Sequence, residues 1–252
     1  MIKVVLLGSG NVASHLIKVM EANAAIDLVQ VYARSKKSLE NIIDSNKVTT
    51  SFADLKEANI YVISVSDKAI EEVSNQIPFT HKLVVHTSGT MGFDVINPKN
   101  KRGVFYPLQT FSKSKEVEMK SVPFCLETEN VEDYKTIENL AKSLSNSVYA
   151  INGEQRKSLH ISAVFVSNFA NHMYQIGNAL CEENNVPFAI LQPLIEETAN
   201  KIKTLTPTEA QTGPAIRKDE PTIQKHLEAL ENPIYKELYQ KITLSIQNVK
   251  KL

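Results

Sequence analysis

The sequence predicts an α/β fold, in which a doubly wound, mainly parallel sheet precedes an all-helical C-terminal domain that opens on a long helix. Short apolar runs typical of buried parallel strands alternate with helical patterns in the first part of the chain. A glycine-rich turn follows the first of these runs, and no convincing strand follows Asn152-Gly153. We therefore expect two domains, residues 1–152 and 153–252.

The first fourteen residues combine a buried-type strand with a dinucleotide-type turn. Residues 2–7 are almost wholly apolar, and Gly8, Gly10 and Ala13 then form the pattern G-x-G-x-x-A at the start of a helix. Such glycines permit a tight turn and a close approach of backbone to a pyrophosphate, which the helix N-terminus attracts. We predict cofactor contacts from Gly8, Ser9, Gly10, Asn11 and Val12. The alternative is an ordinary strand-to-helix turn that uses glycine for backbone reasons only.

The end of the second expected strand, residues 28–32, favours NADP over NAD. An NAD site carries an acidic residue about twenty positions after the glycines, where it binds the ribose hydroxyls. Here Arg34, Ser35, Lys36 and Lys37 supply cations and a hydroxyl instead, and arginine grips phosphate with two parallel hydrogen bonds. We therefore predict that Arg34, Ser35 and Lys36 bind the 2′-phosphate of NADP. The alternative is a solvated basic start to the next helix.

Further strands are expected to extend the sheet. The expected strands are 48–50, 60–65, 83–86, 103–106, 122–126 and 147–151, and the expected helices between them are 37–46, 52–57, 68–75 and 131–144. Ligands of such sheets collect at the carboxyl ends of the strands. We therefore expect a cofactor crevice lined by Val65, Ser66, His86 and Thr87, with Tyr106 and Gln109 beside the substrate. Asp67 is placed to cap the helix that follows it.

Helical periodicity dominates the C-terminal part. Residues 154–183 form one long helical pattern, and more helices are expected at 187–203, from Pro207, at 219–230 and at 233–250. These helices present more apolar surface than one thin layer can cover. We therefore expect a homodimer through this domain.

Composition excludes several classes of protein. The 28 Lys and Arg residues balance the 28 Asp and Glu residues, so neither a nucleic-acid partner nor a membrane surface is expected. No apolar stretch is long enough to span a bilayer, and the N-terminus carries no signal-peptide pattern, which predicts a soluble cytoplasmic protein. Cys125 and Cys181 are predicted to be reduced, and the histidine spacing indicates no metal site.

Four segments resemble one protein family. They are LLGSGNVASHL near the N-terminus, YPLQTFS at 106–112, HISAVFVSNF at 160–169 and TGPAIRKDEPTIQKHL at 212–227. On these segments the chain resembles Rossmann-like two-domain NADP oxidoreductases of the coenzyme deazaflavin-dependent type, which carry a C-terminal domain of unknown function. The wider group holds 6-phosphogluconate dehydrogenase, pyrroline-5-carboxylate reductase and ketopantoate reductase. The resemblance implies the fold and NADP as cofactor, but no particular substrate.

The resemblance also implies candidate catalytic residues in an interdomain cleft. By analogy with the wider group, His160 is predicted to donate a proton to a carbonyl or imine, and Asn168 to orient the substrate. The alternative is a structural His160 within the domain interface. Thr212 and Arg217 are further substrate-binding candidates, in a segment whose Gly-Pro and Asp219 also indicate a turn and a helix cap. One departure concerns Tyr106, because we expect relatives to have histidine before this Pro-Leu-Gln.

Three functions are compatible with this pattern. The leading hypothesis is an NADP-dependent oxidoreductase that transfers hydride between NADP(H) and the carbonyl or imine of a small polar metabolite. The second is an NADP-binding sensor or scaffold without turnover, which the tyrosine at position 106 favours. The third is hydride exchange between NADP(H) and a deazaflavin or flavin.

Overall fold

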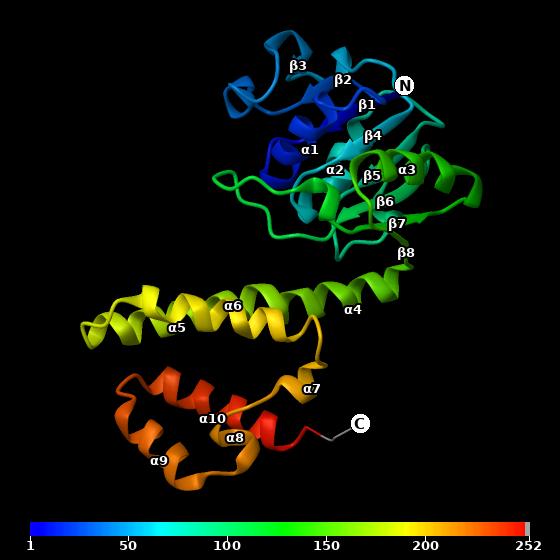
Figure 1. The fold of residues 1–252 in the computed structure, drawn as a ribbon. Coiled ribbons are helices and arrows are strands. Elements are labelled where there is room, and N and C mark those ends of the chain that lie inside the picture. The colour runs from blue at the N-terminus through cyan, green and yellow to red at the C-terminus, as the bar shows by residue number, and fades with distance from the viewer. Residues whose placement is uncertain (250–252) are drawn as a thin grey trace. The chain divides into compact units, whose positions relative to one another are not determined.

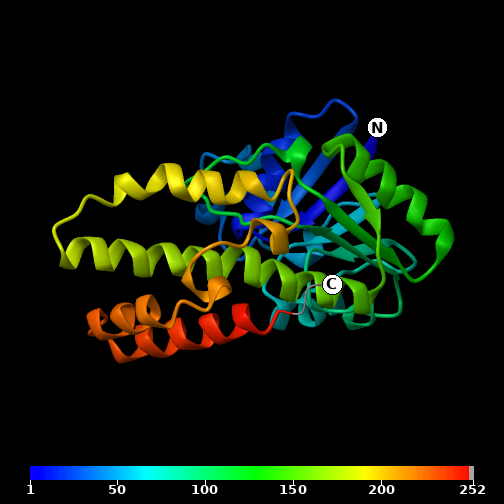
Figure 2. The same cartoon turned by 60° about the horizontal axis from the view of Figure 1, so that its bottom comes forward.

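The computed structural model describes residues 1–249 (Figures 1 and 2). The chain forms two compact units, Met1–Ser167 and Asn168–Leu252. The first unit contains the sheet and its covering helices, and the second unit is helical. Among the described helices, none is long and apolar enough to cross a bilayer.

The first unit is built on one eight-stranded sheet with the order β3-β2-β1-β4-β5-β6-β7-β8. The strands are β1 (Ile2–Leu7), β2 (Ile26–Tyr32), β3 (Val48–Thr49), β4 (Ile60–Ile63), β5 (Leu83–His86), β6 (Lys101–Pro107), β7 (Phe124–Thr128) and β8 (Val148–Ala150). All neighbouring strands pair in parallel except β6 and β7, which pair antiparallel. The predicted doubly wound, mainly parallel sheet is confirmed. Its strand order reverses between β1 and β4, where ligands of such sheets bind.

Helices bury both faces of the sheet. Val4 and Leu6 of β1 pack in the core beneath α1 (Asn11–Glu21) and α3 (Val131–Leu144), whereas Val5 and Leu7 pack on the opposite side with α2 (Ile70–Gln76). Because alternate residues of a strand point to opposite faces, an apolar run is needed where both faces are covered. Because β1 is buried on both faces, it holds the glycine turn that follows it in place at the carboxyl end of the strand.

Two connections differ from the helices that we predicted for them. The segment 37–46 forms two short 3₁₀ turns, Lys36–Leu39 and Ser45–Lys47, and the segment 52–57 keeps only Phe52–Asp54. Asn41 has a φ of 62°, a left-handed conformation that an α-helix cannot contain. Asp44 also accepts a hydrogen bond from the backbone N–H of Asn46, which favours a turn. By contrast, α3 coincides with the helix predicted at 131–144.

The long helical pattern predicted at 154–183 is occupied by three consecutive helical segments. They are α4 (Gly153–Ala163), a π-helical turn at Val164–Phe169 and α5 (Ala170–Glu183). The capping box of Asn152 and Gln155 starts α4. The first compact unit extends through α4 to Ser167, beyond the boundary that we predicted at residue 152 from the end of the strands.

The second unit holds the remaining helices. They are α6 (Gln192–Lys201), α7 (Pro207–Ala210), α8 (Pro214–Arg217), α9 (Glu220–Ala229) and α10 (Pro233–Gln247). Helix α6 starts after a 3₁₀ turn at Phe188–Leu191, and α8 packs against both α9 and α10. Helices α9 and α10 lie side by side in both views (Figures 1 and 2). The helix end predicted at Lys250 lies outside the described residues.

Candidate functional site

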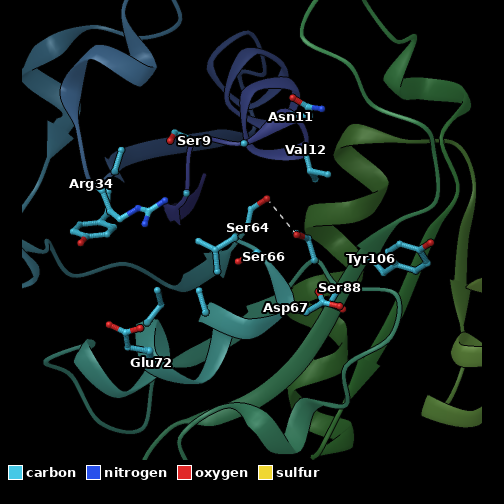
Figure 3. Close-up of a pocket in the computed structure, with 18 of the residues that line it drawn as sticks. Ser9, Asn11, Val12, Arg34, Ser64, Ser66, Asp67, Glu72, Ser88 and Tyr106 are labelled. Carbon is cyan, nitrogen blue, oxygen red and sulfur yellow. Dashed lines mark hydrogen bonds between the residues drawn. The ribbon is translucent and has the colours of Figure 1, made fainter.

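A cavity of about 700 Å³ lies in the first unit, at the carboxyl ends of the central strands (Figure 3). Its walls come from the turn after β1, the end of β2, the turn at Phe52, the loops after β4 and β5, helix α2, the end of β6 and one residue of α4. The lining residues are Gly8, Ser9, Gly10, Asn11, Val12, Tyr32, Ala33, Arg34, Phe52, Ser64, Val65, Ser66, Asp67, Ala69, Glu72, Val73, Gln76, Thr87, Ser88, Gly89, Thr90, Tyr106 and His160. This volume is in the range of ligand and cofactor sites.

The glycine turn is held tightly against β4. Gly8 has a φ of +142°, and a Cβ atom there would lie 2.0 Å from the carbonyl oxygen of Ser64. Only glycine fits both restraints. Gly10 is the N-cap of α1 and makes no side-chain cap, so the first amides of the helix are available to an anion in the cavity. A Cβ at Gly10 would meet nothing within 4 Å.

Arg34 stands at the β2 end of the cavity, where its side chain extends into the site (Figure 3). Tyr32 and Phe52 also line the cavity, and their ring centroids lie 4.1 Å apart. Ser35 and Lys36 follow Arg34 on the surface and are exposed, but they are not among the lining residues. This end of the cavity thus presents a guanidinium and an aromatic wall.

The loops after β4 and β5 are joined by hydroxyl groups. Thr87 Oγ1 donates to Ser64 Oγ at 3.2 Å, as drawn in Figure 3, and Thr90 Oγ1 donates to Asp67 Oδ2 at 2.5 Å. The prediction that Asp67 caps the following helix is wrong. Ser66 is the N-cap of the 3₁₀ turn there, and the Asp67 carboxylate is instead turned to the neighbouring loop. The physical reason is a tertiary partner that local spacing does not reveal.

His86 does not line the cavity, although we predicted it as a cofactor residue. Its ring is fully buried, with Nε2 3.0 Å from the carbonyl oxygen of Gly92 and Nδ1 accepting from the N–H of Ser88. Burial lowers the pKa of this imidazole, which is therefore neutral at neutral pH. The side chain supports the loop at 87–92 from beneath.

Tyr106 and His160 meet at the other end of the cavity. The Tyr106 hydroxyl lies 3.1 Å from His160 Nδ1, and burial raises the pKa of Tyr106 to about 12. The hydroxyl can donate to Nδ1 of a neutral imidazole and accept from a protonated one. Gly89 packs so closely here that a Cβ would lie 2.7 Å from His160 Nδ1. The pair is thus confined against the β5 loop.

The other predicted site residues lie elsewhere. Gln109 is exposed, and its Oε1 accepts from the N–H of Thr110. Asn168, Thr212 and Arg217 belong to the second unit and are exposed there; Thr212 borders a separate apolar cavity of about 280 Å³ within that unit. The cap predicted at Asp219 is confirmed, because its carboxylate accepts from the N–H of Thr222.

Sequence reasoning missed a buried ion pair beside the site. Arg156 of α4 and Glu127 of β7 are 29 positions apart and carry no motif. The only local signal is a charged residue within the second turn of a helix that follows the sheet.

Comparisons with known proteins agree with this architecture. Residues 122–246 match the model of a domain of unknown function, DUF2520. A solved structure described as a "putative NADP oxidoreductase" from Bacteroides fragilis is 40% identical, with a TM-score of 0.87 over 98% of each chain. This chain belongs to the family of that Bacteroides protein.

More distant structures show the same fold. A protein of Thermotoga maritima is 19% identical, with a TM-score of 0.75 over 97% of this chain and 96% of that one. Pyrroline carboxylate reductase from Plasmodium falciparum, solved with NADP bound, is 14% identical, with a TM-score of 0.65 over 98% of each chain. No curated protein matches the present chain.

Proposed function

We propose that the protein is an NADP-dependent oxidoreductase, which transfers hydride between NADP(H) and the carbonyl or imine group of a small polar metabolite. One observation carries this proposal: a single cavity joins the uncapped N-terminus of α1, Arg34 and the Tyr106–His160 pair. The description of the Bacteroides relative as an NADP oxidoreductase supports the cofactor.

The residues present fit a dinucleotide phosphate. Gly8, Ser9, Gly10, Asn11 and Val12 would hold the pyrophosphate, because the free amides and the dipole of α1 attract negative charge. Arg34, with Ser35 and Lys36 beside it, would hold the 2′-phosphate. Val65, Ser66 and Thr87 would line the path between these groups and His160.

The bound cofactor would supply or accept the hydride. His160 would hold the accompanying proton, because an imidazole nitrogen can both accept and donate one and its Nδ1 is kept in place by Tyr106. Tyr106 itself is a poor base, since its pKa of about 12 keeps the hydroxyl protonated. Asn168, Gln109, Thr212 and Arg217 are proposed as further substrate contacts.

The cofactor assignment predicts selective stabilisation by NADPH. At a concentration of one hundred times its dissociation constant, a ligand adds about 2.7 kcal/mol of stability. We expect a clear rise in the melting temperature with NADPH and a smaller one with NADH, measured by thermal shift. Absence of any shift with both nucleotides would contradict the proposal.

Arg34→Met tests the phosphate contact in the same assay. A charge-assisted hydrogen bond contributes about 1.5–3 kcal/mol, so the NADPH affinity should fall roughly 10- to 100-fold while the NADH affinity stays unchanged. The matched control is Lys37→Met, which removes the same charge from an exposed neighbour that does not line the cavity.

We also propose that the protein is a homodimer through its second unit. Among the described apolar residues of that unit, only Ala215 and Ile223 are buried, whereas Ile190, Leu194 and Ile234 expose more than half of their surface. Exposed apolar residues of this kind are common where protein chains associate, which supports the proposal. Light scattering should give twice the 28.1 kDa of the chain.

Substitution of the exposed apolar face tests the dimer. The double variant Ile190→Glu and Leu194→Glu should be monomeric, because charges would be buried in the interface. Val131→Glu is the control, since Val131 is 90% exposed on the first unit. A light-scattering mass of one chain for the wild-type protein would contradict the proposal.

A further inference from the structure

Arg156 is the largest fully buried side chain among the described residues, with no exposed surface. Removing a guanidinium from water costs several kcal/mol unless charge and hydrogen bonds compensate it. The cations of the other ion pairs in the described chain all keep part of their side chain in contact with solvent. Among these cations, the complete burial of Arg156 therefore requires an explanation.

Three segments meet at this guanidinium. Nη1 donates to Glu127 Oε2 on β7, and Nη2 donates to the carbonyl oxygen of Met91 at 2.7 Å. The other carboxylate oxygen of Glu127 accepts from the N–H of Gly153 at 3.0 Å, at the first turn of α4. The pair thus ties the start of α4 both to the sheet and to the end of the β5 loop.

Stability alone is a weak explanation of this arrangement. Arg156 Nε has no hydrogen-bond partner among the described groups, so the guanidinium is not fully satisfied. Buried ion pairs can often be replaced by apolar residues of similar volume without loss of stability. Packing of α4 on the sheet is also supplied by Leu159, which contacts the cluster of Val104, Tyr106 and Cys125.

The two segments that Arg156 joins, α4 and the loop after β5, each carry lining residues of the cavity. His160 lies one helical turn after Arg156, on the same side of α4. Met91 directly follows the lining residues Thr87, Ser88, Gly89 and Thr90. Since Gly89 leaves no room for a Cβ beside His160 Nδ1, a small displacement of loop or helix would separate His160 from Tyr106 or press it against the loop.

We propose that Arg156 is a positioning residue, which with Glu127 fixes the distance between His160 and the β5 loop. This positioning holds in the protein without a bound ligand. Its importance for catalysis rests on the proposed function of the cavity. Arginine suits the task because its planar fork reaches two acceptors at once, whereas lysine offers a single point charge.

The test compares Arg156→Met, Arg156→Lys and Glu127→Gln by NMR of the histidine rings. The chain has six histidines, and the His160 signal is identified by its loss in His160→Gln. We expect the His160 ring signals to shift or broaden in Arg156→Met and Glu127→Gln and to shift less in Arg156→Lys, while those of His15 and His226 stay in place. Lys101→Met is the control, because it breaks the ion pair of a half-exposed lysine with Asp133 and should leave His160 unchanged.

Two results would overturn the positioning role. The first is a His160 signal identical to wild type in every variant that folds, and the second is an equal shift of all histidines, which indicates a general structural loss. If Arg156→Met does not fold, Arg156→Lys and Glu127→Gln still decide the question. Titration of the wild type with NADPH is read separately, so a failure of the proposed function leaves the positioning result standing.

Discussion

Gly8→Ala is expected to destabilise the protein by about 3 kcal/mol or more. A positive φ costs a residue with a side chain about 1–3 kcal/mol, and overpacking adds about 1–3 kcal/mol. Here the new Cβ would lie 2.0 Å from the carbonyl oxygen of Ser64 and 2.7 Å from its carbon, which are backbone atoms. Ser64 in turn donates its N–H to Leu7 at 2.8 Å, so neither chain can move without breaking the pairing of β1 with β4.

Gly10→Ala is the matched comparison. A Cβ at this position meets nothing within 4 Å, and the φ of −75° is open to any residue. We expect the free energy of unfolding, measured with denaturant, to stay within about 0.5 kcal/mol of wild type. NADPH affinity should nevertheless fall about tenfold or more, because the methyl group stands where a pyrophosphate would approach. Equal stability of the two variants would contradict the account of Gly8, and unchanged affinity would contradict the account of Gly10.

His160→Ala is expected to lower the rate constant of turnover by about 10²–10⁴, the usual contribution of a positioned proton donor. NADPH affinity should change little, because the pyrophosphate and 2′-phosphate contacts that we propose lie on other segments of the cavity wall. Tyr106→Phe should have a smaller effect, since it removes the hydroxyl 3.1 Å from His160 Nδ1 and leaves the imidazole. The measurement is NADPH consumption with a panel of carbonyl compounds, imines, flavins and deazaflavins.

Lys157→Ala controls this experiment. Lys157 is a second ionisable side chain one turn before His160 on α4, but unlike the buried Arg156 it is exposed, and it does not line the cavity. It should retain the wild-type rate. Equal rates for His160→Ala and wild type would remove His160 from the reaction, and tight NADPH binding without turnover of any panel member would favour the sensor function.

Local patterns were sufficient for most of the fold. The apolar run of β1, the glycines after it and the periodicity of α3 are each determined by neighbours within a few residues, and the structure confirms the sheet and helix that they predict. The segment 37–46 failed because its polar pattern suits a helix and a series of turns almost equally. The positive φ of Asn41 and the hydrogen bond that Asp44 accepts from the N–H of Asn46 favour turns there.

The sequence by itself determined which strand ends border the cavity, because the carboxyl ends of parallel strands must meet at one edge of the sheet. Only the tertiary structure decided which side chains face it. Asp67 accepts a hydrogen bond from Thr90 instead of capping a helix, and His86 is buried beneath the loop that follows it. Arg156 donates to the carbonyl oxygen of Met91, 65 positions away in the sequence. Such roles depend on which distant polar groups come within hydrogen-bond distance, and local periodicity carries no information about that.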